Sequence, residues 1–298
     1  ALGVRRTLGA SRSEIKEEAE GRGTFAEGST RWPVHAPRTK ITALTKKPRM
    51  RIALVSDIHG NLPALKAVVE DIARRNVDAI VNLGDSLSGP LMPLETAQFL
   101  MAQDWIQLAG NHERQLLTLP TSGQRGESDA FAHARLGAAE FAWIASLTPC
   151  LRFSPEVLLC HGTPDSDLTY FLETVEPTQL RMATAAEIDA RLGTVEAGTE
   201  LVACGHTHLP RVMHASNGTL IVNPGSVGLQ AYGDEHPYPH HVETGSPDAR
   251  YALVERHDHG QWTCTLVTVP YDHAAMAALA AANGRPDWAH ALATGRMP

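Results

Sequence analysis

The stretch "RIALVSDIHGNLPAL", residues 51–65, ends an apolar run with two polar side chains where a plain turn would suffice. Residues 52–55 are all apolar, which is typical of a strand buried inside a parallel sheet. Asp57 and His59 follow almost directly. An Asp-x-His pair alone is too common to carry meaning, so its significance depends on the partners that the rest of the chain supplies.

The composition is that of a folded protein without a membrane span. The chain has 298 residues, of which 43% are hydrophobic, enough for one large domain or two ordinary ones. No apolar stretch approaches the ~20 residues that cross a bilayer, and no charged-then-apolar leader opens the sequence. The four cysteines show no disulfide or paired C-x-x-C spacing. We therefore expect a cytoplasmic protein with reduced cysteines and no membrane contact.

The charges divide the chain into two unequal parts. Residues 1–49 hold 11 Lys+Arg and 5 Glu, whereas residues 50–298 hold 15 basic and 28 acidic residues. Residues 50–298 are too acidic to form a nucleic-acid-binding surface, so no nucleic-acid partner is expected. Residues 1–49 also lack hydrophobic periodicity, which predicts a disordered or loosely attached extension followed by one folded domain over 50–298. The sequence leaves the oligomeric state open.

From Arg51 onward, strand and helix patterns alternate. Apolar residues at i, i+3 and i+4 spacing predict a helix over 61–76. Further strands are expected over 78–85 and 156–162, a strand ending in a loop over 105–113, and a strand and loop over 200–210. Further helices are expected over 93–104, 129–147, 177–193 and 273–284. After residue 210 the chain becomes rich in strand patterns, with an Asn217-Gly218 turn signal. This order predicts an α/β domain of two packed sheets.

Polar side chains follow five of the predicted strands at equivalent positions. In open α/β sheets, function gathers at the carboxyl ends of the strands. The candidate ligands there are Asp57, His59, Asp85, Asn111, His161, His206 and His208. Oxygen and imidazole donors without thiolates suit Mn, Fe, Co, Ni or Zn. Seven candidates exceed what one ion with an open position needs, and they suit two ions bridged by a carboxylate.

These residues stand in five motifs: "SDIHGN", "LGDSLSGP", "GNHE", "CHG" and "GHTH". In this order the sequence resembles the calcineurin-like metallophosphoesterase superfamily. "VNPGSVG" and "ARYALVE" are similar to its small prokaryotic phosphodiesterase branch. The resemblance runs from Met50 to the C-terminus and leaves the first 49 residues uncovered. It implies a four-layer α/β/β/α sandwich of two mixed sheets.

The resemblance also implies a role for each residue. Asp57, His59 and His208 would hold the first divalent ion, Asn111, His161 and His206 the second, and Asp85 would bridge them. His112 would face the substrate as the catalytic acid. A hydroxide between the ions would attack phosphorus in line, while the ions neutralise the phosphoryl oxygens. The expected partner is thus a small phosphoester substrate.

One departure from the family pattern bears on the substrate. Protein phosphatases of this superfamily carry Asp-Arg-Gly after Gly-Asp, whereas this chain has Ser88-Gly89-Pro90. Without a bidentate arginine clamp, a phosphomonoester dianion loses a main contact, which favours a phosphodiesterase. The departure also leaves His112 without its usual orienting aspartate. The alternatives are a phosphomonoesterase or nucleotide pyrophosphatase on the same site, or a non-catalytic scaffold, which the complete ligand set disfavours.

Other polar and aromatic residues have plainer interpretations. Glu113 is predicted to cap the helix that follows it. His236, His240 and His241 lie in "DEHPYPHH", which is predicted to be a surface loop whose histidines take no part in the site. Tyr170 fits a place in the wall of the cleft as well as a place in the core.

Overall fold

The computed structural model describes residues 49–119, 126–258 and 260–298. The predicted N-terminal extension lies outside these residues, except for residue 49, and the domain boundary stays a prediction. Strand β1 (Met50–Val55) opens the described fold.

The first sheet has the strand order β14-β13-β1-β2-β3. Its other strands are β2 (Ala79–Asn82), β3 (Ile106–Gln107), β13 (Ala249–Arg256) and β14 (Trp262–Val269). β1, β2 and β3 run parallel, and β13 runs antiparallel to β1 with Ile52 opposite Val254. The last strands of the chain therefore complete the sheet that the first strands begin.

The second sheet has the strand order β4-β5-β8-β10-β9. Its strands are β4 (Cys150–Ser154), β5 (Val157–Cys160), β8 (Leu201–Ala203), β9 (Arg211–His214) and β10 (Leu220–Asn223). The three central strands are parallel, and both edge strands are antiparallel to their neighbours. The carboxyl ends of β5 and β8 thus lie at one edge of this sheet.

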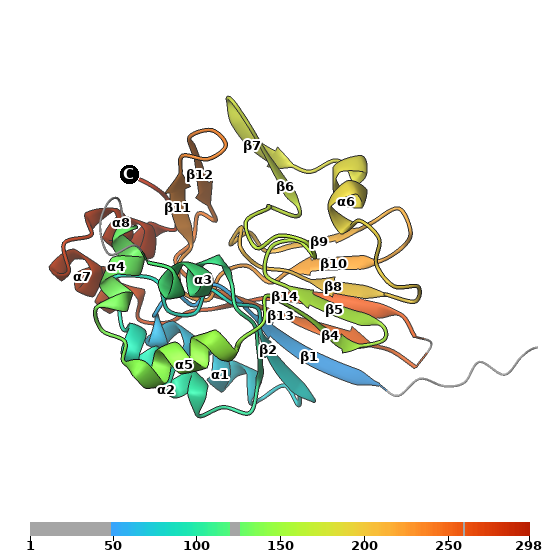
Figure 1. Ribbon diagram of the computed structural model, residues 1–298, viewed down its shortest axis with the longest axis horizontal. Coiled ribbons are helices and arrows are strands. Elements are labelled where there is room, and N and C mark those ends of the chain that lie inside the picture. Colours follow the sequence, from blue (N-terminus) through green and yellow to red (C-terminus); the bar gives the residue numbers. More distant parts are fainter. Residues whose placement is uncertain (1–48, 120–125, 259) are drawn as a thin grey trace, which may run out of the picture. The chain divides into compact units, whose positions relative to one another are not determined.

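The two sheets pack face to face around one apolar core. Apolar side chains of both inner faces, among them Leu54, Val81, Leu159 and Val222, are fully buried there. Helices α1 (Leu62–Ile72), α2 (Pro93–Met101) and α5 (Ala138–Ser146) cover the outer face of the first sheet, and α6 (Ala185–Leu192) covers that of the second (Figure 1). This arrangement confirms the predicted α/β/β/α sandwich.

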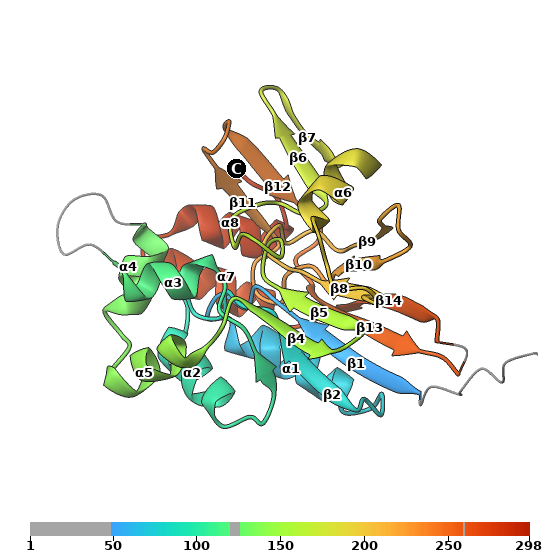
Figure 2. The same ribbon diagram turned by 45° about the vertical axis from the view of Figure 1, so that its right-hand side comes forward.

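Further elements surround the carboxyl ends of the parallel strands. They are helices α3 (Asn111–Leu117), α4 (Glu127–His133), α7 (His273–Ala282) and α8 (Pro286–Thr294), and the hairpins β6 (Glu173–Glu176)–β7 (Gln179–Met182) and β11 (Ala231–Asp234)–β12 (His240–Glu243). The two hairpins project side by side beyond the sheets, and α8 lies beside α4 and β11 (Figures 1 and 2). These additions form the walls of the functional site.

Two predicted helices are wrong in extent, and one helix was missed. The helix expected over 129–147 is interrupted before Gly137, whose N–H is accepted by the Glu140 side chain at 2.9 Å as α5 begins. The first part of 177–193 is strand β7, because it pairs with β6. Pairing with the neighbouring strand β6 therefore outweighed the helical pattern, and α8 was hidden behind the Gly284-Arg285-Pro286 break.

Two expectations drawn from composition can be compared with the described residues. All four cysteines are free, and Cys160 and Cys204 are buried in the core outside the second sheet. Among the described helices, none has the length and apolar character that crossing a membrane requires.

Candidate metal centre

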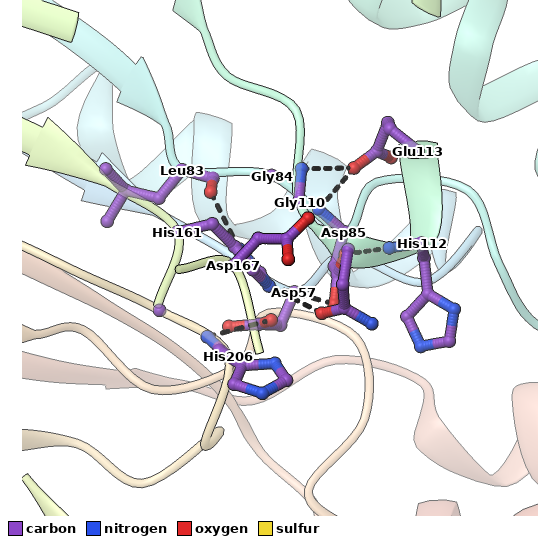
Figure 3. A network of polar contacts seen from close by, with 12 residues as sticks. Asp57, Leu83, Gly84, Asp85, Gly110, His112, Glu113, His161, Asp167 and His206 are labelled. Carbon is purple, nitrogen blue, oxygen red and sulfur yellow. Dashed lines mark hydrogen bonds and ion pairs between the residues drawn. The ribbon is translucent and has the colours of Figure 1, made fainter. Parts of the chain in front are cut away.

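The predicted ligands converge where the carboxyl ends of the parallel strands of both sheets meet. β1 is followed by Asp57 and His59, and β2 by Asp85. Asn111 and His112 begin α3, while His161, His206 and His208 follow β5 and β8. Figure 3 shows Asp57, Asp85, His161 and His206 gathered from these loops, with His112 to one side. All the predicted ligands except His206 are buried. The structure thus brings together every residue that the five motifs supplied.

The turns that carry the ligands are strained. Asp57, His59, Asp85, His206 and His208 have φ angles between 52° and 69°. Within the described ranges, only one other non-glycine residue has a positive φ. Such conformations persist only where the surroundings enforce them, and they cluster at functional sites. The concentration of strain here marks this edge of the sheets as the functional one.

Glu113 holds two of these turns together. Its Oε2 accepts the N–H groups of Gly110 at 2.7 Å and Asp85 at 2.8 Å, and its Oε1 accepts that of Ser86 at 2.8 Å (Figure 3). The predicted capping role is confirmed. The carboxylate also fixes the loop after β2, and a Cβ atom at Gly84 or Gly110 would overlap the other loop. The bridging candidate Asp85 is therefore rigidly placed.

The loop after β10 fixes Asp57 in a similar way. The Ser226 hydroxyl donates to the Asp57 carbonyl oxygen at 2.7 Å, and the Gly228 N–H donates to the same oxygen at 3.0 Å. Ser226 is fully buried, so it serves as a structural group and not as a nucleophile.

His59 and His208 face each other through nitrogens that carry no proton. Their Nδ1–H groups donate to the carbonyl oxygens of Ser88 at 2.8 Å and Leu229 at 2.7 Å. Burial lowers the pKa of His59 to about 4 and the pKa of His208 well below its usual range, so both rings are neutral. Their Nε2 atoms therefore present lone pairs, and they lie 3.0 Å apart.

A carboxylate completes this first group. Oδ1 of Asp57 lies 3.5 Å from Nε2 of His208, and Oδ2 of Asp57 has no hydrogen-bond partner among the described residues. Burial raises the pKa of Asp57 to about 7, and the neighbouring Asp85 adds to the shift, although His161 opposes it. One ligand atom each from Asp57, His59 and His208 lies within 4.8 Å of the others. Two imidazole lone pairs and a carboxylate oxygen without a hydrogen-bond partner, brought this close together, fit a divalent cation.

A second group is formed by Asp85, His161 and His206, also within 4.8 Å of one another. The Nδ1–H of His161 donates to the Leu83 carbonyl oxygen at 2.9 Å, which directs Nε2 toward Oδ2 of Asp85 at 3.1 Å and Oδ1 of Asn111 at 3.2 Å. Burial disfavours a charged His161, but Asp85 and Asp57 raise its pKa to about 10. With the protein groups alone, a proton holds this cluster together, and a bound cation would replace it.

His206 is oriented by its backbone and by one carbonyl oxygen. Its Nε2–H donates to the Leu168 carbonyl oxygen at 3.1 Å, which leaves Nδ1 as its ligand atom. Its backbone N–H donates to Oδ1 of Asp57 at 3.3 Å, so the loops after β1 and β8 are joined. The tautomers of all four candidate ligand histidines are thus set by backbone carbonyl groups.

His112 has an orienting carboxylate after all, from a helix that sequence reasoning did not connect with it. Asp129 of α4 accepts the Nδ1–H of His112 at 2.8 Å and the Ser88 hydroxyl at 2.7 Å, both on Oδ1. Burial disfavours the imidazolium, but Asp85 and Asp129 raise the pKa of His112 to about 9. The sequence left open which residue replaces the usual orienting aspartate, and the structure places Asp129 there, to which no local signal pointed.

Two tyrosines and a histidine from the hairpin region form another group that sequence reasoning did not assign. His240 donates from Nδ1 to the Tyr238 carbonyl oxygen at 2.8 Å, so its Nε2 accepts the Tyr170 hydroxyl at 3.1 Å. The hydroxyls of Tyr170 and Tyr232 lie 2.6 Å apart, and the Tyr170 ring lies 5.1 Å from that of His206. His240 is buried, so the prediction of an exposed loop is wrong for it.

A cleft of about 1260 Å³ opens over both ligand groups. The two hairpins, α4 and α8 contribute to its walls, through residues that include His112, Asp129, Tyr170, Tyr232 and Trp288. This volume exceeds what a phosphoryl group needs and suits a larger organic ligand.

Comparison with known proteins identifies a family whose sequence model matches this chain. The sequence model described as the calcineurin-like phosphoesterase superfamily domain matches residues 50–244. The uncharacterized protein MJ0912 of Methanocaldococcus jannaschii is 24% identical over 244 residues, which cover 80% of this chain and 94% of that protein. The matched range contains every predicted ligand and ends before β13, so α7 and α8 lie outside it.

Two solved structures share the fold over nearly their whole length. A metallophosphoesterase from Sphaerobacter thermophilus has a TM-score of 0.63 at 25% identity, covering 83% of this chain and 99% of its own. The hypothetical protein PH1004 from Pyrococcus horikoshii OT3 has a TM-score of 0.61 at 18% identity, covering 84% and 100%. The second likeness concerns the fold alone.

Proposed function

Because this chain belongs to the calcineurin-like phosphoesterase superfamily, we propose that it is a phosphoester hydrolase that uses two divalent metal ions and prefers phosphodiesters. The observation that carries the proposal is the pair of three-residue groups in which one candidate ligand atom of each residue lies within 4.8 Å of the others. When bound, the two ions would supply an activated water and the positive charge that phosphoryl transfer requires.

The protein's own residues divide the remaining work. Asp57, His59 and His208 would hold one ion, Asn111, His161 and His206 the other, and Asp85 would lie between them. His112 lines the cleft beside these groups, and its ring lies 5.5 Å from that of His59. A protonated His112 can donate to the leaving oxygen as a general acid. Asp129 would keep its ring in that orientation and tautomer.

The preference for diesters rests on the absence of an arginine beside the first ligand group. The segment Ser88-Gly89-Pro90 offers no guanidinium, and its Gly89 and Ser88 lie beside the first ligand group. A dianionic monoester needs more positive charge near its free oxygens than a monoanionic diester does. Two metal ions without an arginine clamp therefore suit the diester better.

Metal analysis and two aryl esters test the proposal. The full chain is loaded with Mn, Ni, Co or Zn, its metal content is measured, and hydrolysis of bis(p-nitrophenyl) phosphate and p-nitrophenyl phosphate is compared. We expect about two ions per chain and faster hydrolysis of the diester. Monoester preference would support the phosphomonoesterase alternative instead.

Substitution of the second ligand group tests the mechanism. His161→Ala and Asp85→Ala should each abolish hydrolysis of both esters, with the fold retained by circular dichroism. His214→Ala, at an exposed position of β9, is the matched control and should change nothing. Full activity in either ligand variant would reject the two-metal mechanism, and a chain that binds no metal would support the scaffold alternative.

A further inference from the structure

Helix α8 inserts a tryptophan into the wall of the cleft. Trp288 is 7% exposed, lines the cleft and packs its ring edgewise against His59, with the ring centroids 5.9 Å apart and an interplanar angle of 76°. A Cβ atom placed on Gly89 would lie 2.7 Å from the indole Cη2 and 3.0 Å from Cζ3. The indole therefore fills the space that a side chain at position 89 would need.

Position 89 is the one at which the Asp-Arg-Gly pattern would place its arginine. Gly89 has a φ of 153°, a backbone conformation that side chains other than hydrogen rarely adopt. Both the backbone and the neighbouring indole thus exclude an arginine there. The chain has replaced a cationic side chain beside the first ligand group with an aromatic one from a distant helix.

The arginines in the described lining of the cleft do not compensate for this replacement. They are Arg191 and Arg285. Arg191 donates to the carbonyl oxygens of Phe171 and Glu173, and Arg285 pairs with Asp287 at 2.7 Å and donates to the Ser128 hydroxyl at 2.9 Å. Both guanidinium groups are already engaged with protein acceptors.

Trp288 is held firmly in place. Its ring packs among buried apolar side chains of α7, α8 and β11, including Met276, Leu292 and Ala231. The guanidinium carbon of Arg285 lies 5.6 Å from its ring centroid. A rigid aromatic group loses little conformational entropy when it contacts a ligand, which makes it an effective specificity element.

We propose that Trp288 determines the ester specificity of this site, as an aromatic wall for the organic group that distinguishes a phosphodiester from a monoester. The inference rests on the phosphohydrolase function proposed above. A diester presents an apolar group that gains contact with the indole. A monoester presents a charged oxygen there, whose water would be displaced without a compensating hydrogen bond.

Two esters with the same leaving group test this role. Bis(p-nitrophenyl) phosphate and p-nitrophenyl phosphate are assayed with the metal-loaded wild type, Trp288→Ala, Trp288→Phe and the control Trp262→Ala. Trp288→Ala should lower kcat/KM for the diester roughly three- to tenfold, mainly through KM, as expected for loss of an aromatic contact. The monoester should change less than about twofold by the same reasoning, and Trp288→Phe should keep most of the diester activity.

Trp262→Ala is the matched control for Trp288→Ala. Trp262 lies on β14, contacts Glu200 through its Nε1–H and does not line the cleft, so Trp262→Ala should leave the ratio of the two activities unchanged.

Metal content and thermal unfolding are measured on every variant. If Trp288→Ala does not fold, Trp288→Leu is used in its place, because leucine keeps an apolar side chain at this position. The ratio of kcat/KM for the diester to kcat/KM for the monoester is then measured on Trp288→Leu. An unchanged ratio, or an equal fall for both esters with both ions bound, overturns the role of Trp288. Wild-type protein that holds two ions and hydrolyses neither ester would instead reject the proposed function.

Discussion

The Nε2 atoms of His59 and His208 lie 3.0 Å apart, and neither carries a proton to share. Each ring donates its Nδ1–H to a backbone carbonyl oxygen, and burial keeps both rings neutral. Two lone pairs at this distance repel each other unless a cation lies between them. The fold therefore holds these side chains in an arrangement that a bound cation would make favourable.

Metal binding should stabilise the protein measurably. Free metal at 100 times its dissociation constant adds about 2.7 kcal/mol per ion to the free energy of unfolding. For a domain of this size that corresponds to a rise in Tm of roughly 5–10 °C per ion. Thermal unfolding with chelator and with added Mn or Zn measures the difference, and Asp57→Asn, which lacks one ligand charge, should show a smaller rise. An identical Tm with and without metal would contradict the assignment of the site.

His112→Ala should separate catalysis from metal binding. The side chain pairs with Asp129 and is not a member of either three-residue ligand group, so both ions should stay bound. Loss of a general acid lowers kcat by roughly 10²- to 10⁴-fold. Metal analysis and steady-state kinetics on bis(p-nitrophenyl) phosphate check both expectations. Loss of one ion would mean that His112 is a ligand.

Asp129→Asn should act through His112 and not through the metals. The amide cannot fix the imidazole tautomer as the carboxylate does, so kcat should fall roughly 10- to 100-fold with KM and metal content little changed. The double variant with His112→Ala should be no slower than His112→Ala alone, because both changes remove the same function. Additive losses in the double variant would show that Asp129 works independently of His112.

Glu113→Ala should destabilise the fold even without metal. The carboxylate accepts three backbone N–H groups, those of Gly110, Asp85 and Ser86, and its loss leaves them buried and unpaired. The free energy of unfolding should fall by roughly 3–5 kcal/mol, measured by urea denaturation of the metal-free protein. Glu140→Ala is the matched control, since Glu140 accepts only the N–H of Gly137 there, and a loss of about 1 kcal/mol is expected. Equal losses of unfolding free energy in the two variants would show that Glu113 does not hold the two loops together.

Much of the candidate site could be predicted from local sequence. Each ligand directly follows a strand or opens a helix, so the residues that place it are its own neighbours, such as the apolar run 52–55 before Asp57. The helix over 61–76 was also predictable from its own periodicity, and it is observed as α1. The local pattern misled at 177–193, where a helix was predicted but the first part of the segment forms β7 by pairing with the neighbouring strand β6.

The sequence by itself determined the superfamily and the set of residues that gather at the ends of the parallel strands, because strand–turn motifs are local. Only the tertiary structure decided which other side chains surround these candidate ligands. Asp129 reaches His112 from α4, Tyr170 reaches His206 from the loop before β6, and Trp288 reaches Gly89 from α8. These contacts join separate elements of the chain, by a hydrogen bond in the first case and by packing in the other two. No spacing rule records them, and they orient the His112 ring and shape the walls of the cleft.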